Sequence, residues 1–286
     1  MAGSDRPEIG ASVSAAGITT NYLEAGSGSP VVLVHGSGPG VTAYANWRLT
    51  IPGLATRFRV LAPDMVGFGF TERPPGVAYG METWVGQLLG FLDALGLERA
   101  SVVGNSFGGA LALRLAAQHP ERVHRLVLMG SVGVPFPITP GLDAVWGYQP
   151  SVATMRALLD VFAHSRELVT DELAQVRYEA SVQPGFQEAF AAMFPAPRQR
   201  WVDAMVTPDE EIARLPHPTL VVHGRDDRVI PLANALHLLD VVPDVRLHVF
   251  GRCGHWTQIE HADAFVRLLI DFLSPAGGTQ QGGTDR

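Results

Sequence analysis

The chain has 286 residues, of which 47% are hydrophobic and 17% charged, and its formal net charge is −7. This composition is typical of a globular protein with enough apolar residues for a sizeable core. The acidic balance and the lack of a basic run argue against a nucleic-acid partner. No apolar run of about 18 residues and no signal-peptide pattern occur, so we expect no membrane partner. A single cysteine, Cys253, cannot form an intramolecular disulfide, which favours a cytoplasmic location.

Short apolar runs alternate with longer helical patterns along the chain. An alternating stretch at 11–26, with an Ala-Gly turn, predicts an antiparallel hairpin at a sheet edge. Runs that are apolar on both faces predict buried parallel strands, and they lie at 30–36, 58–64, 100–106, 124–130, 219–224 and 245–251. Helical patterns separate them, for example at 81–96, 107–119 and 262–273. This order predicts an α/β fold with a mostly parallel, doubly wound sheet.

The interval between Gly130 and Thr219 is far longer than the crossover of about a dozen residues that a parallel sheet requires. Helical patterns, prolines and aromatic residues fill it, which indicates an inserted helical lid. The predicted organisation is therefore a core at 1–132, a lid at 133–208, the rest of the core at 209–273, and a Gly-rich, disordered tail at 274–286.

Ser106 lies in a G-x-S-x-G motif, "GNSFG", at the junction of a predicted strand and a predicted helix. This is the setting of a nucleophile elbow, in which a strained turn presents the serine and small residues two positions away avoid a collision. The alternative is a tight β–α turn with an ordinary capping serine. We interpret Ser106 as a candidate nucleophile.

A serine hydroxyl becomes a good nucleophile only when a base removes its proton. In the chain order Ser, acid, His, the stretch "HGRDDRVIP" offers Asp226 and Asp227, and "GRCGHWTQIEH" offers His255. Both stretches follow predicted strands and so belong to the same sheet edge as Ser106. The spacing does not separate Asp226 from Asp227. No H-E-x-x-H pattern or Cys/His cluster occurs, so we expect no metal site.

An oxyanion hole requires two further donors. The backbone N–H of Phe107, at a predicted helix N-terminus, can supply one, and the loop "HGSGPG" can supply the second through Ser37. The loop glycines Gly36 and Gly38 allow the backbone to approach a ligand closely. A phosphate-binding turn is the alternative, but the G-x-x-x-x-G-K-[ST] pattern is missing.

Arg177 lies in the stretch "TDELAQVRYEAS" of the predicted lid. Leu173, Val176, Arg177 and Ala180 follow the spacing i, i+3, i+4, i+7, which places the arginine on or beside an apolar stripe. No carboxylate lies three or four residues away. An inward guanidinium requires an anion, and a substrate carboxylate would provide one. A snorkelling arginine, or one paired with a distant acid, fits the spacing equally well.

The motifs "HGSGPGVTAYANWR", "GNSFGG", "PAPRQRW", "HGRDDRVIP" and "CGHWTQIEH" resemble those of the meta-cleavage product hydrolases. These α/β-hydrolases cleave carbon–carbon bonds in bacterial aromatic catabolism. The likeness covers about residues 12 to 273, and the lid segments resemble the monocyclic branch more than the biphenyl branch. It implies Ser106 as nucleophile, Asp227 as acid, His255 as base, and Ser37 and Phe107 as oxyanion donors.

The resemblance also assigns the substrate-binding residues. It implies that Arg177 binds the substrate carboxylate and that Asn46 and Asn105 contact the dienol end. Trp256 would lie beside the base, and Phe162 would line the pocket. Some relatives have glycine where this chain has Ser37, and a backbone donor survives either choice.

The implied activity is that of a serine-dependent hydrolase acting on 2-hydroxy-6-oxohexa-2,4-dienoates, either 2-hydroxymuconic semialdehyde or its 6-alkyl analogues. Cleavage of C5–C6 would yield 2-hydroxypenta-2,4-dienoate and a carboxylic acid, with no cofactor because the substrate carries its own electron sink. A general serine carboxylesterase and a non-catalytic small-molecule receptor of the same fold are the alternatives. Dehalogenases and epoxide hydrolases are disfavoured because their nucleophile is Asp. The sequence leaves open the C6 substituent and whether the chain forms a homo-oligomer, dimeric or higher, as many relatives do.

Overall fold

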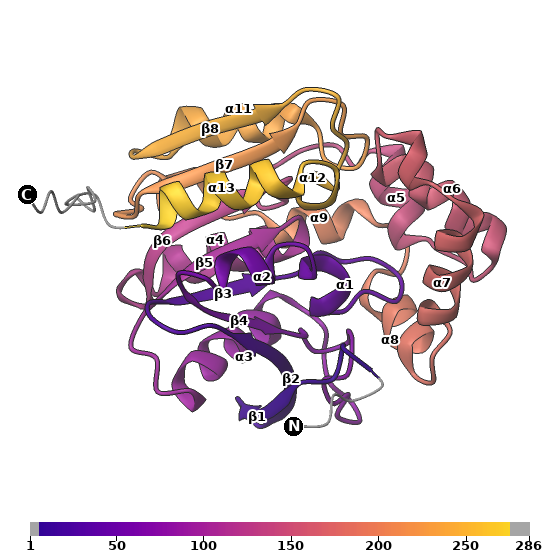
Figure 1. Cartoon of the computed structure of the whole chain (residues 1–286), viewed down its shortest axis with the longest axis horizontal. Coiled ribbons are helices and arrows are strands. Elements are labelled where there is room, and N and C mark those ends of the chain that lie inside the picture. The colour runs from indigo at the N-terminus through magenta and orange to yellow at the C-terminus, as the bar shows by residue number, and fades with distance from the viewer. Residues whose placement is uncertain (1–5, 275–286) are drawn as a thin grey trace, which may run out of the picture.

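The computed structural model describes residues 6–274 of the chain. Eight strands form one sheet in the order β1-β2-β4-β3-β5-β6-β7-β8 (Figure 1). The first pairings, β1 with β2 and β2 with β4, are antiparallel, and every later pairing is parallel. The strands are β1 (Ala11–Ala15), β2 (Ile18–Ala25), β3 (Pro30–Val34), β4 (Arg59–Pro63), β5 (Ala100–Asn105), β6 (Val123–Met129), β7 (Thr219–Gly224) and β8 (Val245–Phe250). The predicted edge hairpin and parallel sheet are confirmed.

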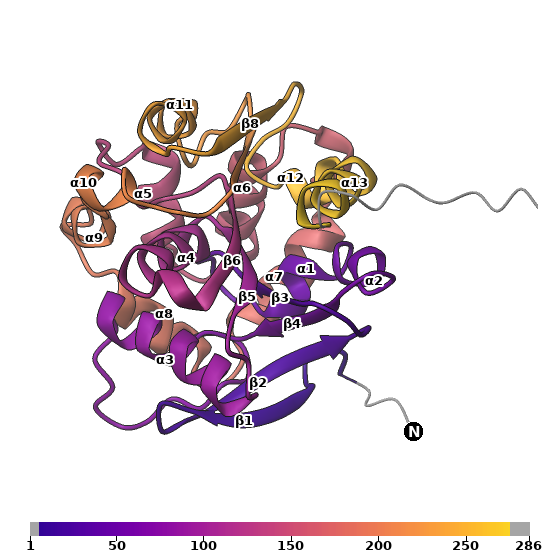
Figure 2. The ribbon, with the colours of Figure 1, turned by 90° about the vertical axis from the view of Figure 1, so that its left-hand side faces the viewer.

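Helices cover both faces of the sheet (Figure 2). Alternate residues of one strand belong to different cores: Val32 and Val34 of β3 pack in one hydrophobic cluster, and Val31 and Leu33 in the other. The first cluster includes side chains of α3 (Met81–Ala94), α4 (Phe107–Gln118) and α11 (Leu232–Val241). The second includes side chains of α1 (Ala43–Trp47), α2 (Ile51–Leu54) and α13 (Ala262–Leu273). Burial on both faces explains why the central strands are apolar throughout.

Strand β8 differs from the expectation for 245–251. We predicted a strand buried on both faces, but Arg246, His248 and Val249 are exposed. The reason is its position, because β8 is the last strand of the sheet and pairs only with β7. The helical layers cover such an edge incompletely.

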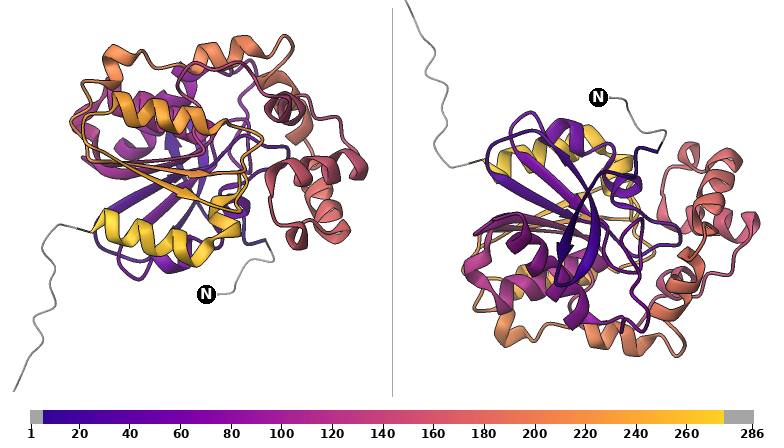
Figure 3. Two further views of the ribbon diagram at one scale, coloured as in Figure 1. Left: turned by 90° about the horizontal axis from the view of Figure 1, so that it is seen from above. Right: turned by 90° about the horizontal axis from the view of Figure 1, so that it is seen from below.

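The segment between β6 and β7 is helical. It contains α5 (Pro140–Trp146), α6 (Val152–Phe162), α7 (Asp171–Ser181), α8 (Phe186–Met193), α9 (Gln199–Met205) and α10 (Asp209–Ile212). Hydroxyl side chains cap three of these helices: Thr139, Ser151 and Thr170 accept hydrogen bonds from the backbone N–H groups of the first turns of α5, α6 and α7. Helices α5 to α8, in rose and salmon, form a group beside the core at one end of the strands (Figure 3).

The remaining elements are short. They are the 3₁₀ turns η1 (Pro120–Arg122) and η2 (Arg166–Leu168) and the helix α12 (Thr257–Glu260). The lid boundaries 133 and 208 stay predictions, and the disordered tail expected at 274–286 falls outside the described residues apart from Ser274. None of the helices in residues 6–274 combines the length and the apolar character that crossing a bilayer requires.

Candidate active site

Ser106 occupies a strained turn between β5 and α4. Its backbone has φ 54° and ψ −114°, a conformation that residues other than glycine rarely adopt. The flanking glycines have no room for side chains: a Cβ on Gly104 would lie 2.3 Å from the carbonyl oxygen of Gly108, and one on Gly108 would lie 2.3 Å from that of Val34. The motif therefore has the strand–turn–helix context that was predicted, and its glycines are sterically required.

The imidazole of His255, which follows β8, contacts a buried carboxylate that follows β7. His255 Nδ1 donates to Asp227 Oδ2 at 2.7 Å, while the other oxygen of Asp227 accepts the backbone N–H groups of Val229 and Ile230 at 2.7 and 2.9 Å. Burial raises the pKa of Asp227, but the nearby imidazoles and the backbone donor outweigh it and leave the pKa below its ordinary value. The carboxylate is thus ionised, and it fixes the orientation of the ring.

Asp226 points away from this pair. Its Oδ2 accepts the backbone N–H of Cys253 at 3.3 Å and lies near Arg225 and His164 at the surface. Its side chain is 33% exposed, whereas that of Asp227 is 1% exposed. Of the two candidate acids, the geometry places only Asp227 against His255.

The loop after β3 carries unused backbone donors. The backbone N–H of Gly36 donates to Asn46 Oδ1 at 3.1 Å, and the indole of Trp146 in α5 donates to Ser37 Oγ at 2.9 Å. The hydrogen bonds of residues 6–274 use neither the backbone N–H of Ser37 nor that of Phe107 at the start of α4. Both predicted oxyanion donors are therefore available to a ligand.

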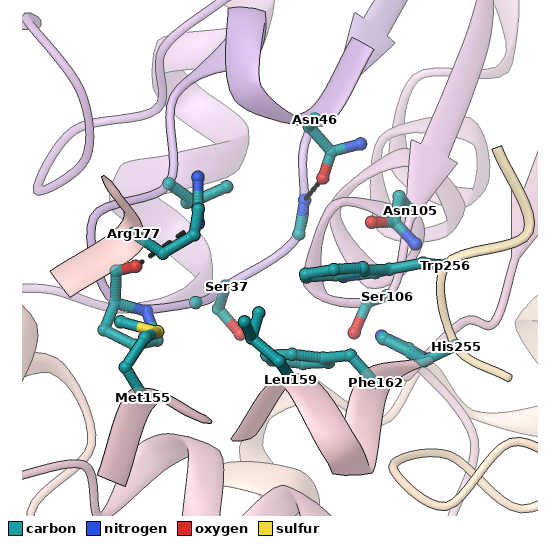
Figure 4. Close-up of a pocket in the computed structure, with 14 residues that line it drawn as sticks. Ser37, Asn46, Asn105, Ser106, Met155, Leu159, Phe162, Arg177, His255 and Trp256 are labelled. Atoms are coloured by element: carbon teal, nitrogen blue, oxygen red, sulfur yellow. Dashed lines mark hydrogen bonds between the residues drawn. The ribbon is translucent and has the colours of Figure 1, made fainter. Parts of the chain in front are cut away.

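These elements surround a small cavity of about 40 Å³ (Figure 4). Ser106 and His255 lie at one end and Arg177 at the other, with Ser37 and Leu159 between them. No hydrogen bond joins the Ser106 hydroxyl to His255 in the described part of the chain, although both line the same space. The lining residues are Gly36, Ser37, Gly38, Pro39, Val41, Asn46, Asn105, Ser106, Met155, Leu159, Phe162, Arg177, His255 and Trp256.

Comparison with known proteins identifies this arrangement. The family model described as alpha/beta hydrolase fold matches residues 29–262. A 2-hydroxymuconate semialdehyde hydrolase from Pseudomonas sp. (strain CF600) is 62% identical over 270 residues, 94% of this chain and 95% of that protein. A 2-hydroxy-6-oxo-2,4-heptadienoate hydrolase from Pseudomonas putida F1 is 62% identical over 267 residues, 93% of this chain and 97% of that protein.

A solved structure agrees. The meta-cleavage product hydrolase of Pseudomonas fluorescens IP01, a serine-to-alanine mutant complexed with acetates, superposes with a TM-score of 0.93 at 58% identity. The match covers 94% of this chain and 98% of that one. The chain belongs to the meta-cleavage product hydrolases, within the α/β-hydrolase fold. The family expected from the sequence motifs is thereby confirmed.

Arg177 of this meta-cleavage product hydrolase lies in α7 with its guanidinium in the pocket. Its one described hydrogen bond runs from Nη2 to the carbonyl of Pro39 at 3.4 Å, and no described carboxylate pairs with it. Burial, with a smaller contribution from the charge of Arg48, lowers the pKa of Arg177 to about 10. The guanidinium is still a cation at neutral pH, and its buried position favours the binding of an anion beside it.

The apolar stripe predicted for α7 is only partly correct. Of the predicted positions, Leu173, Arg177 and Ala180 are half-buried and Val176 is 55% exposed, while the buried residues of α7 are Ala174 and Ser181, which the prediction did not name. The reason is that α7 lies at the rim of the lid, where Val176 borders an open crevice shared with α1. Arg177 is therefore positioned by the edge of the helix and not by the centre of an apolar face.

Asn46 and Trp256 also line the pocket of this meta-cleavage product hydrolase. Asn46 lines the cavity, and its buried Nδ2 has no hydrogen-bond partner among the described residues. Trp256 stacks on Phe162 of α6 with ring centroids 5.0 Å apart and planes at 11°. Asn105 lines the same wall and donates weakly to the carbonyl of Met129, at 3.4 Å.

The loop of His255 is joined to the lid. The backbone N–H of His255 donates to the carbonyl of Phe162 at 2.7 Å. Glu260 strengthens this connection, because its carboxylate accepts the N–H of Gly254 at 2.7 Å and those of His164 and Ser165 at 2.8 Å each. The helical segment between β6 and β7 therefore helps to position His255.

Sequence reasoning missed several pocket residues. Met155 and Leu159 line the cavity together with Phe162, and their spacing of i, i+4, i+7 on α6 is a signal that could have found them. Gly130 was missed as well: it has φ +50°, and a Cβ there would lie 3.2 Å from the ring of His255. Its only signal was a glycine at the end of a predicted strand. Within residues 6–274 no cluster of three or more His, Cys, Asp or Glu side chains could hold a metal ion.

Proposed function

We propose that this hydrolase cleaves the C5–C6 bond of 2-hydroxy-6-oxohexa-2,4-dienoates, with 2-hydroxymuconic semialdehyde or a 6-alkyl analogue as substrate. One observation carries the proposal. A guanidinium without a carboxylate partner stands at one end of the pocket that contains Ser106 and His255 at the other. A substrate with a carboxylate at one end and a reactive carbonyl at the other matches this polarity.

Arg177 would bind the substrate carboxylate, an interaction that arginine's planar fork suits well. The unpaired Nδ2 of Asn46 would donate to the oxygen on C2, and Asn105 would assist from the neighbouring wall. A relative of known structure is described as complexed with acetates, which are small carboxylates. Both contacts stabilise negative charge on the dienolate in a water-poor site.

The first chemical step would convert the dienol into its keto form, with a proton placed on C5. This step is needed because a carbanion at C5 is a poor leaving group without an electron sink. The 2-oxo group formed by ketonisation accepts the electron pair through the C3–C4 double bond. His255, oriented by Asp227, is the group that would transfer the proton.

In the second step Ser106 would attack the carbonyl at C6 while His255 takes its proton. The resulting oxyanion would accept the backbone N–H groups of Phe107 and Ser37, each of which is unused. C5–C6 then breaks, the electron pair moves to the 2-oxo end, the resulting dienolate oxygen takes up the proton that His255 removed from Ser106, and 2-hydroxypenta-2,4-dienoate departs. Water releases the acyl group from Ser106 as a carboxylic acid, which is formate when the substrate is the semialdehyde.

The preferred C6 group would be hydrogen or a small alkyl chain. The two relatives at 62% identity are named for a semialdehyde and for a heptadienoate, whose C6 substituents are hydrogen and methyl. A cytoplasmic location belongs to the same proposal, supported by the free, buried thiol of Cys253. A homo-oligomer also stays a proposal, drawn from the family resemblance alone.

The test compares dienoates that carry C6 substituents of increasing size with p-nitrophenyl acetate. The proposal predicts that kcat/KM for the semialdehyde or the 6-methyl dienoate far exceeds kcat/KM for the ester. A preference for the ester would instead indicate the carboxylesterase alternative, which needs the same serine but no carboxylate anchor. Ser106→Ala should still bind the dienoate and lose turnover by at least about 10³-fold, and a near-normal kcat would refute the nucleophile.

A further inference from the structure

Three neighbouring cavities with shared lining residues lie between the catalytic pocket and the outer side of α7. The pocket of about 40 Å³ shares Asn46, Arg177 and Trp256 with a second cavity of about 90 Å³. That cavity shares Arg48 and Arg177 with a third, of about 420 Å³. Arg177 thus lines all three, and the largest space lies on its outer side. A ligand that moved from the third, outer cavity to Ser106 by way of the second would pass Arg177.

The outer cavity lies between α1, α7 and the segment 6–8, and its charge is mainly positive. Arg6, Arg48 and Arg177 line it, with Glu8 as the one carboxylate among its lining residues. Arg48 donates to the carbonyl of Ala45 at 2.9 Å, and within residues 6–274 it forms no ion pair. Arg48 and Arg177, neither of which forms an ion pair within residues 6–274, therefore face the same space as a single carboxylate, Glu8, and together they make the potential there positive.

The walls of the outer cavity are aromatic as well as cationic. The rings come from Tyr44 of α1, from Phe70 in the loop after β4, and from Phe186 of α8. Phe70 and Phe186 meet edge to face, with centroids 5.7 Å apart and planes at 67°. A flat, conjugated hydrocarbon chain packs well against such rings, while its anionic end is attracted to the arginines.

We propose that the outer cavity is a binding site for a planar organic carboxylate, which Arg48 receives before it passes to Arg177. The identity of the natural ligand as a dienoate rests on the proposed function. The proposal of the site itself is based on the cavity, on the guanidiniums of Arg48 and Arg177, which form no ion pair within residues 6–274, and on the aromatic walls. Arg48 is a binding residue on this path and takes no part in bond breaking.

The direct test uses sorbate, hexa-2,4-dienoate, which has the flat anionic chain but no carbonyl at C6 to cleave. It is titrated into the Arg177→Met variant, in which the anchor of the catalytic pocket is gone. Salt-sensitive binding should persist there, and adding Arg48→Gln should weaken it at least 5-fold. Arg57→Gln is the matched control, because it removes the same charge at an exposed residue that lines none of the three cavities. Equal sorbate affinity with either addition would overturn the proposal.

A kinetic test uses the otherwise unchanged enzyme. Arg48→Gln should lower kcat/KM for the dienoate roughly 3- to 10-fold at low ionic strength, and the difference should vanish near 0.5 M salt because screening removes the attraction. Arg48→Lys, which retains the charge, should recover most of the loss, and Arg57→Gln should show none. A loss that Arg48→Lys does not recover, or that high salt does not remove, would contradict an electrostatic site. If no dienoate is cleaved but sorbate binding depends on Arg48, the proposed function fails and the site stands.

Discussion

Trp146 of α5 donates a hydrogen bond from its indole N–H to the hydroxyl of Ser37, across 2.9 Å in a buried position. The indole is itself held by a parallel stack on Phe194, with centroids 4.4 Å apart and planes at 9°. Ser37 belongs to the loop that carries one of the two proposed oxyanion donors. The packing of α5 therefore helps to position the residue whose backbone N–H is a proposed oxyanion donor.

Replacing Trp146 with phenylalanine tests this link, because an aromatic ring can still stack on Phe194 while the hydrogen bond is lost. A net hydrogen bond contributes about 0.5–1.5 kcal/mol, so kcat should fall roughly 2- to 10-fold. Ser37→Ala removes the same bond, and the double variant should fall no further than either single one. Additive losses in this cycle would show that the two residues act independently.

Asp227 and Asp226 are adjacent in sequence and differ in environment. Asp227→Asn removes the anion that orients His255 and stabilises its cation, so kcat should fall by about 10³- to 10⁴-fold. Asp226→Asn makes the same chemical change at a partly exposed side chain and should leave kcat within a few-fold of the unaltered enzyme. Steady-state and stopped-flow absorbance measure the turnover of both variants. Comparable losses of kcat in the two variants would refute the proposed role of Asp227 in orienting His255.

We expect Arg177 to lower the free energy of unfolding while it contributes to substrate binding. Burial lowers its pKa to about 10, so the charged form is penalised in the folded state. This penalty is present in full below pH 10 and is relieved as the pH rises above 10, because the folded state then loses its proton before the unfolded state does. Arg177→Met should therefore raise the free energy of unfolding at pH 7 by about 1–3 kcal/mol while it raises KM.

Thermal unfolding checks this trade-off, since each kcal/mol corresponds to about 2–4 °C in Tm for a protein of this size. Arg57→Met, at an exposed position, is the control and should change Tm little. A lower Tm for Arg177→Met would mean that the guanidinium stabilises the fold and is not held there for a ligand.

Cys253 should be chemically inert in the native enzyme even though it lies two residues from His255. Burial raises the pKa of its thiol to about 12, and the Sγ is within 3.6 Å of Thr257 Oγ. At pH 8 only about one molecule in 10⁴ would carry the reactive thiolate. Mass spectrometry after iodoacetamide treatment should find the native thiol unmodified and the urea-unfolded thiol fully alkylated. Alkylation at equal rates in both states would show that the site is open.

Local sequence pattern predicted the strands and the nucleophile turn because these depend on neighbours in the chain. The run before Ser106 is apolar on both faces, as a strand between two helical layers must be, and Gly104 is required by its close approach to Gly108 in the same turn. The requirement at Gly108 is different, because its close contact is with Val34 of the neighbouring strand β3. The same pattern was wrong about the burial of β8, because an edge position depends on the strand order of the whole sheet.

By itself, the sequence determined the α/β architecture, the elbow at Ser106 and the family, since each is encoded in short runs of residue types. The residue spacing alone left Asp226 and Asp227 open, the family resemblance implied Asp227, and the tertiary structure shows Asp227 against His255. Only the tertiary structure decided that Arg177 lacks a carboxylate partner among the described residues and that Trp146 holds Ser37. The physical reason is distance along the chain: Trp146 and Ser37 are 109 residues apart, and Asp227 and His255 are 28 apart. Such pairs come into contact only when the sheet and the lid pack together, and the local pattern of residue types does not predict these contacts.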